Sequence, residues 1–148
     1  RLAWMIPTVW AVATLAFLGI HVDLENQEWG TYLNTESSLD YWISRGGWVA
    51  DYPDPNTFLD MFVTGGGNNR TGWGSPRYDA LIAAAGRERD EGRRMGLFRE
   101  AERILVVDEM PIMPVYFYVS INLYDANRIG GIHPNPLDEH PLKYVFIK

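Results

Sequence analysis

The chain has 148 residues, of which 47% are hydrophobic and 14% aromatic, and its formal net charge is −6. This length suffices for one domain with a sizeable core, and the acidic balance argues against a nucleic-acid partner, which requires clustered lysine and arginine. Because the chain has no cysteine, a disulfide framework, a thiolate nucleophile and a thiolate metal site are all excluded.

Residues 1–18 form an apolar segment that precedes the rest of the pattern. The stretch 2–20 has no charged side chain, which is long enough for a membrane-spanning helix. Arg1 before an apolar run, with Ala-Val-Ala at 11–13, is also typical of a secretory signal with its cleavage site. A buried helix and an artefact of a gene boundary are the other interpretations. We expect the segment to be buried or associated with a membrane.

The pattern from residue 19 onward mixes strands and helices. Alternation of apolar and polar residues predicts a strand at 19–25, and 41–50 is a second extended candidate weakened by its glycines. Residues 55–62 predict a short helix. A Gly/Asn-rich loop at 64–76 matches no phosphate-binding pattern. It ends at Ser75 and Pro76, a favourable helix start.

The helix that begins at Pro76 has an apolar stripe, which consists of Tyr78, Leu81, Ile82 and Ala85. A second helix is expected at 90–108, with an apolar face and with the charged run 87–94 exposed. Its inward side chains are Leu97, Ala101, Ile104 and Leu105. Residues 110–124 and 142–147 are expected to contain strands. This mixed order predicts an α/β fold.

The stretch 44–55, SRGGWVADYPDP, places opposite charges on either side of two glycines. In an extended chain Arg45 and Asp51 share one face and lie roughly 20 Å apart, too far for an ion pair. A short peptide has matching needs: Asp51 binds its ammonium group, Arg45 its carboxylate, and the backbone at Gly46 and Gly47 its main chain. The alternative from spacing alone is that the two charges serve separate structural salt bridges.

Five motifs follow one another from residue 18 to the last residue. They are LGIHVDLENQEW (18–29), SRGGWVADYPDPNTFLDMF (44–62), SPRYDALIAAA (75–85), FREAERILVVDEMPIMPVYFYV (98–119) and NPLDEHPLKYVFIK (135–148). In this order they resemble the C-terminal part of bacterial oligopeptide-binding proteins, the extracytoplasmic solute receptors of peptide ABC importers. The resemblance implies that residues 19–148 are the C-terminal lobe portion of a type II periplasmic-binding-protein-like fold, with a mixed sheet and flanking helices.

The resemblance also implies roles for individual residues. Asp51 holds the α-amino group of the peptide, Arg45 helps to hold its C-terminal carboxylate, and the backbone around Gly47 and Val49 docks an extended peptide. The expected peptide-binding set is Arg45, Gly46, Gly47, Trp48, Val49 and Asp51, with Tyr52 and Trp73 as candidates for a side-chain pocket. Two departures stand out: the chain matches only the last part of much longer family members, so the opposing lobe is missing, and Val49 stands where some relatives have cysteine.

The expected function is that of a receptor, or a fragment of one, that binds short peptides and delivers them to the membrane permease of an ABC transporter. No catalytic residue, cofactor, metal or nucleic acid is expected, and the protein is expected to be monomeric and periplasmic or otherwise extracytoplasmic, with a membrane anchor as one option. One alternative is a receptor for a sugar or a metal chelate on the same scaffold. The other is a glycoside hydrolase that uses carboxylates among Asp51, Asp54 and Asp60.

A metal site is the remaining candidate in the sequence. His133 and His140 lie near Asp138 and Glu139, but their spacing matches no helical or finger pattern of metal ligands. A solvated loop is the favoured interpretation.

Overall fold

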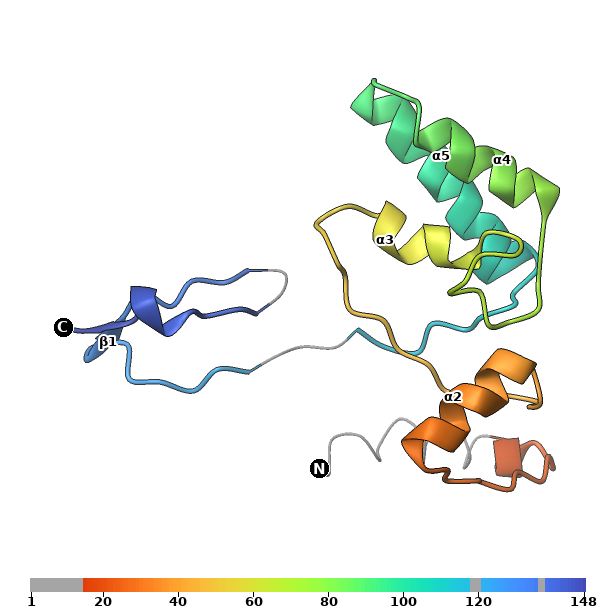
Figure 1. Cartoon of the computed structure of the whole chain (residues 1–148), viewed down its shortest axis with the longest axis horizontal. Helices are drawn as coiled ribbons and strands as arrows, with labels where there is room; N and C mark the ends of the chain where they lie inside the picture. The colour runs from red at the N-terminus through yellow and green to blue at the C-terminus, as the bar shows by residue number, and fades with distance from the viewer. Residues whose placement is uncertain (1–14, 118–120, 136–137) are drawn as a thin grey trace. The chain divides into compact units, whose positions relative to one another are not determined.

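The computed structural model describes residues 15–117, 121–135 and 138–148 (Figure 1). The chain divides into two units, residues 1–41 and 42–148. Residues 15–17 are helical, and Phe17 and Leu18 are exposed. The rest of the apolar segment 1–18 lies outside the described residues, so its assignment stays a prediction. No helix in the described part of the chain has both the length and the apolar character of a membrane span.

The first unit contains helix α2 (Trp29–Ser38), which the sequence did not predict. The Glu28 carboxylate accepts hydrogen bonds from the backbone N–H groups of Gly30 (2.8 Å) and Thr31 (3.2 Å), so it caps the helix. Leu39 ends the helix in the left-handed conformation, with φ at 58°. Such an end usually has glycine, and α2 buries none of its residues. Neither an apolar stripe nor a glycine stop therefore marked this helix.

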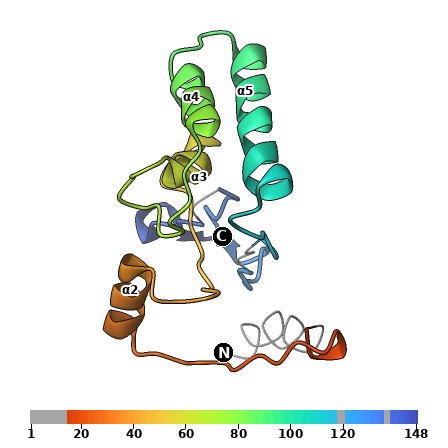
Figure 2. The ribbon, with the colours of Figure 1, turned by 90° about the vertical axis from the view of Figure 1, so that its right-hand side faces the viewer.

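The helices of the second unit lie close to where the sequence predicts them. They are α3 (Asn56–Leu59) with the 3₁₀ turn η1 (Asp60–Phe62), α4 (Pro76–Ala85), α5 (Glu91–Arg103) and the π-helical turn η2 (Ile104–Asp108). Helices α4 and α5 pack side by side, and α3 contacts α5 (Figure 2).

The ends of α4 and α5 follow from local sequence. Pro76 is in the first turn of α4, as predicted, but the Ser75 hydroxyl makes no capping bond; it lies 3.5 Å from a carboxylate oxygen of Glu109. At the start of α5 the Asp90 carboxylate accepts the backbone N–H of Arg93 at 2.8 Å. Proline at the first helical position has the φ of a helix and leaves one fewer N–H group to satisfy, which favours this start.

The core lies between α3, α4 and α5. Its buried apolar members are Leu59, Tyr78, Ile82, Ala85, Phe98, Ala101, Ile104 and Leu105. The predicted stripe of α4 is confirmed, with Leu81 partly buried beside it. On α5 the prediction missed Phe98, which is 2% exposed. The Tyr78 hydroxyl donates to the Leu59 carbonyl at 2.6 Å, and burial raises the pKa of Tyr78.

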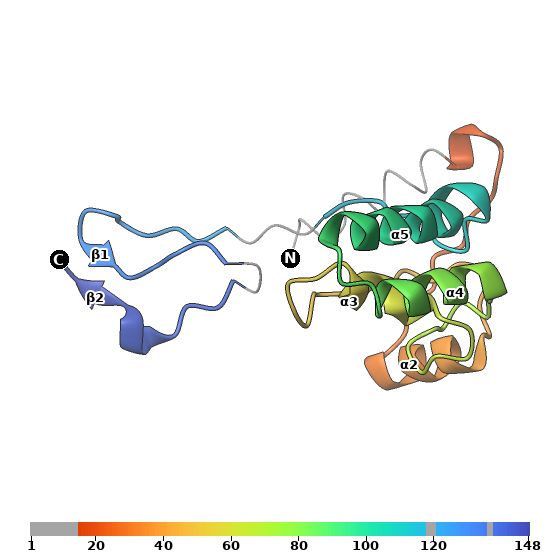
Figure 3. The ribbon, with the colours of Figure 1, turned by 90° about the horizontal axis from the view of Figure 1, so that it is seen from above.

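The sheet in the described residues consists of two short antiparallel strands, β1 (Ile129–Gly130) and β2 (Phe146–Ile147), which lie beside each other in Figure 3. The 3₁₀ turn η3 (Leu142–Tyr144) precedes β2. Gly131 has a φ of 85°, and a Cβ there would collide with the Tyr144 carbonyl. Only glycine suits this position, because it both tolerates a positive φ and leaves room for the facing backbone.

Several strand predictions are wrong for the residues that the structure describes. No strand forms at 19–25 or 41–50, and none in the described part of 110–124; the prediction for 142–147 holds only at β2. Alternating polarity fixes which side chains share a face, but a strand also needs a partner for its backbone hydrogen bonds. Between 15 and 117 the chain offers these segments no such ladder.

Candidate functional site

The stretch 44–51 is irregular, yet residues 47–51 follow the alternation of exposed and half-buried positions expected of an extended segment. Gly47, Val49 and Asp51 are exposed, whereas Trp48 and Ala50 between them are half-buried. The Trp48 indole nitrogen is buried and has no hydrogen-bond partner among the described residues. The predicted binding face is therefore accessible, although no sheet supports it.

Arg45 and Gly46 precede these residues, and both are exposed, so strict alternation does not extend to Gly46. An Nη2 group of Arg45 donates to the hydroxyl of Tyr116 at 3.0 Å. Tyr116 lies 71 residues further along the chain, in the segment that follows α5. The Tyr116 hydroxyl accepts from one edge of the guanidinium, and the planar fork of a guanidinium can donate two parallel hydrogen bonds to a carboxylate.

Asp51 has a fixed backbone and an accessible carboxylate. Its backbone N–H donates to the hydroxyl of Thr57 at 3.1 Å, and Thr57 is only 2% exposed. No hydrogen bond or ion pair joins the Asp51 carboxylate to another group in the described part of the chain. This carboxylate can therefore accept hydrogen bonds from a cationic ligand.

Asp54, three residues later, is bound within the protein. Its two carboxylate oxygens accept hydrogen bonds from Arg94 at 2.6 and 2.9 Å, and one of them also accepts the Asn56 backbone N–H at 2.9 Å. The Arg94 hydrogen bonds hold the pKa of the Asp54 carboxyl below its usual value, although partial burial acts in the opposite direction. Arg94 belongs to the run 87–94 that the sequence assigned to solvent, and this is wrong for Arg94, which is half-buried.

The two candidate pocket aromatics have different surroundings. Tyr52 is 40% exposed, and the Asn56 side-chain amide donates to its hydroxyl at 3.0 Å and to Asp60 at 3.0 Å. Trp73 donates its indole N–H to Glu109 at 2.7 Å and packs edge-on against the Tyr78 ring. The Trp73 contacts anchor the Gly/Asn-rich loop to the core. A role of either aromatic in a pocket stays a prediction.

In the described part of the chain, histidines pair with single carboxylates but form no larger cluster of metal-ligating side chains. His140 lies 2.9 Å from Asp138, and the Asn122 amide donates to the same Asp138 oxygen at 2.6 Å. His133 is exposed. Within residues 15–117, 121–135 and 138–148, no group of three metal-ligating side chains is present.

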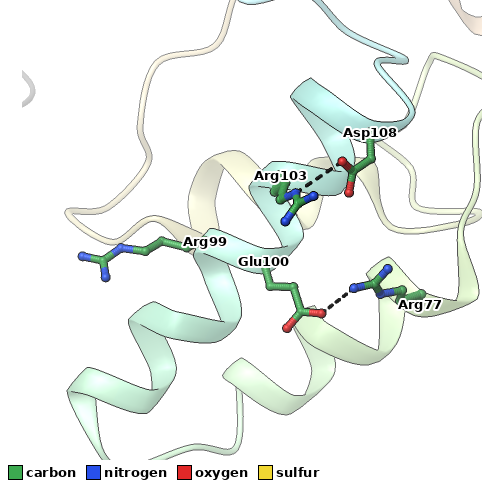
Figure 4. A pocket seen from close by; sticks show the side chains of 5 residues that line it. All are labelled: Arg77, Arg99, Glu100, Arg103 and Asp108. Carbon is green, nitrogen blue, oxygen red and sulfur yellow. Dashed lines mark hydrogen bonds and ion pairs between the residues drawn. The ribbon is translucent and has the colours of Figure 1, made fainter.

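An open groove on α4 and α5 is lined by charged side chains only (Figure 4). Arg77 pairs with Glu100 at 2.7 Å, and Arg103 with Asp108 at 3.3 Å. Arg99 points away from the other four side chains. Because these paired charges compensate each other and solvent reaches them, we place the candidate site at Arg45–Asp51.

The comparisons with known proteins point to one family. The model of "Bacterial extracellular solute-binding proteins, family 5 Middle" matches residues 10–70. The dipeptide-binding protein DppE of Bacillus subtilis is 39% identical over 131 residues, 88% of this chain and 23% of its own length. The oligopeptide-binding protein OppA of Bacillus subtilis is 42% identical over 118 residues, 79% of this chain and 22% of its own length.

Solved structures agree with this assignment. The Escherichia coli murein tripeptide binding protein MppA has a TM-score of 0.78 and 30% identity, covering 99% of this chain and 28% of that protein. The Haemophilus influenzae OppA, solved in complex with the peptide RPPGFSPFR, has a TM-score of 0.73 and 32% identity, covering 86% of this chain and 25% of that protein. The chain belongs to the family 5 solute-binding proteins of bacteria.

The predicted family and fold are therefore confirmed. The helices and the small sheet are part of the periplasmic-binding-protein-like fold of OppA and MppA. The chain spans about a quarter of the length of the relatives that it matches. Relatives such as the Salmonella typhimurium OppA, 35% identical over 147 residues, are periplasmic by name.

Sequence reasoning missed three residues that hold the site. Thr57, Arg94 and Tyr116 each bond to a residue of the stretch 45–54. Thr57 lies in the predicted helix 55–62 and Arg94 in the predicted helix 90–108, but no pattern indicates their partners. The Arg94 bond spans 40 residues and the Tyr116 bond 71, so only the folded structure reveals them.

Proposed function

We propose that this chain binds short peptides as part of the substrate-binding component of a peptide ABC importer. The observation that carries the proposal is the pair of accessible, oppositely charged groups of Asp51 and Arg45 at the two ends of a Gly-Gly-Trp stretch. Asp51 binds the ammonium group of the peptide and Arg45 its carboxylate, since both form charge-assisted hydrogen bonds. The backbone at Gly46, Gly47 and Val49 and the indole of Trp48 contact the peptide between its ends.

The names of the relatives support this assignment. They include a dipeptide-binding protein, several oligopeptide-binding proteins and a murein peptide-binding protein. By analogy we assign this protein a periplasmic or extracytoplasmic location, a monomeric state and a membrane permease as its partner. A membrane anchor formed by residues 1–18 is one option within this proposal.

We further propose that the protein has no catalytic activity. A glycoside hydrolase needs one carboxyl group that stays protonated as a general acid. Asp54 does not fit this role, because Arg94 holds its carboxylate in the charged form with a lowered pKa. Asp60, the third candidate, accepts hydrogen bonds from Tyr52 and Asn56, so we assign it a structural role, and Asp51 alone does not form the required pair.

The test is calorimetry on the gene product that contains this sequence, with peptides of one length at a time from two to five residues. We expect saturable binding that N-acetylation of the peptide weakens by about ten- to a hundredfold, the contribution of a charge-assisted hydrogen bond. Asp51→Asn should remove this preference for the free amine. Absence of peptide binding at every length, or turnover of a peptide or a glycoside, would contradict the proposal.

A further inference from the structure

The Asp54–Arg94 ion pair joins the ligand-binding stretch to the rigid helices. The guanidinium of Arg94 bonds both oxygens of Asp54, and the side chains of the pair are only 28% and 27% exposed. We propose that Arg94 and Asp54 are positioning residues for the carboxylate of Asp51. This inference rests on the proposed function, because it assigns Asp51 to the ammonium group of the ligand.

Arg94 is itself fixed by both helices of the core. Its Nε group donates to the Ala85 carbonyl at the end of α4 at 3.2 Å. Its guanidinium lies over the ring of Phe98 on α5, 4.7 Å from the ring centre, and Phe98 is almost fully buried. A cation over an aromatic face is attracted by the ring. The position of Arg94 is therefore set by α4 and α5, independently of the loop that it binds.

Asp54 and Asp51 lie in one hydrogen-bonded turn, so holding Asp54 in place also restricts the position of Asp51. The Asp54 carboxylate accepts the Asn56 N–H and the Asp54 carbonyl accepts the Thr57 N–H at 3.2 Å. The Thr57 hydroxyl in turn accepts the Asp51 N–H. Thr57 thus bonds both Asp51 and Asp54, and the Asp54 carboxylate ties the same turn to Arg94 of α5. Holding a binding group in place before the ligand arrives lowers the ordering cost of binding.

A purely electrostatic effect of the pair is the competing explanation. Without Asp54, the uncompensated guanidinium of Arg94 would repel the ammonium group of the ligand and attract the Asp51 carboxylate. In the structure the Arg94 charge is satisfied by Asp54 and by the Ala85 carbonyl. Positioning predicts that Arg94→Met lowers the preference for a free amine, whereas simple electrostatics predicts that it raises this preference. This variant therefore separates the two explanations.

The experiment measures affinity for one peptide with a free and with an acetylated N-terminus, and takes the ratio of the two affinities. If the pair positions Asp51, Arg94→Met and Asp54→Asn should each lower this ratio by about three- to tenfold, a part of the whole effect of a charge-assisted bond. The double variant should lower it no further than either single variant, because one interaction is lost in each case. Arg94→Lys should fall between Arg94→Met and the wild type, and it serves if Arg94→Met does not fold.

The control is Arg93→Met, which removes the same charge from the same turn of α5. Arg93 is exposed, and its backbone N–H keeps its bond to Asp90 in the variant, so the ratio should not change. A ratio that rises in Arg94→Met and falls in Asp54→Asn would assign the effect to charge alone and overturn the proposal. Equal losses for free and acetylated peptides would also overturn it, because the pair would then be structural only. A wild type without any preference for the free amine would instead contradict the proposed function.

Discussion

Thr57→Val tests whether a buried hydroxyl holds the backbone of the binding stretch. Valine has nearly the shape of threonine but cannot accept the Asp51 N–H, which lies 3.1 Å from the Thr57 hydroxyl. A typical intramolecular hydrogen bond contributes about 1 kcal/mol to stability, and up to about 3 kcal/mol is lost when a buried partner stays unsatisfied. Because Asp51 is exposed, water can replace the lost acceptor. We therefore expect Thr57→Val to lower the free energy of unfolding, measured in urea, by about 1 kcal/mol.

Stability alone does not identify the lost bond, so the site needs its own measurement. Thr57→Ser keeps the hydroxyl but removes a buried methyl group, which costs roughly 0.8 kcal/mol. Both variants are thus destabilised to a similar degree. Amide hydrogen exchange separates them: the Asp51 N–H should lose protection in Thr57→Val and keep it in Thr57→Ser. Equal protection of Asp51 in Thr57→Val and the wild type would refute the reasoning.

Three further predictions concern the charged groups. Asp51→Asn should weaken peptide binding by about ten- to a hundredfold, clearly more than Asp54→Asn; equal effects in calorimetry would remove Asp51 from the ammonium role. Amidation of the peptide C-terminus and Arg45→Ala should be non-additive by about 1 kcal/mol or more, and Tyr116→Phe should reduce this coupling; full additivity at every peptide length would make Arg45 structural. Asp54 has a folded pKa below its usual 3.8, so the stability it contributes is complete above that value and is lost as the pH falls through the folded pKa; thermal melts of the wild type and Asp54→Asn should converge in acid, and a constant difference would contradict this.

The helical hairpin could be predicted because its signals are local. Pro76 fixes the start of α4, and residues spaced by three and four positions, such as Tyr78 and Ile82, form its buried stripe. Phe98 was missed although it fits the same spacing. Helix α2 has no such stripe, since it buries none of its residues. The strands failed for a different reason: period-two polarity does not specify a backbone partner, and the described residues offer these segments none.

At the site, too, features set by neighbouring residues could be predicted, whereas contacts between residues far apart in the sequence could not. Sequence reasoning placed Asp51 and Arg45 on one accessible face, and the structure has both exposed. Spacing placed Asp51 on the face of Arg45, and the resemblance gave it the ammonium role, but neither indicated what binds Asp54.

Their difference arises from α5, a helix that begins 40 residues after Asp51 in the numbering of the chain. Arg94 reaches the Asp54 carboxylate, whereas the Asp51 carboxylate has no partner in the described part of the chain. A binding carboxylate must keep its acceptor sites open, whereas a carboxylate that holds a loop must fill them. One arginine, fixed by the core, therefore assigns these two roles to two neighbouring aspartates. Replacing Arg94 should blur the distinction, and the ratio of affinities for free and acetylated peptides measures how far it does so.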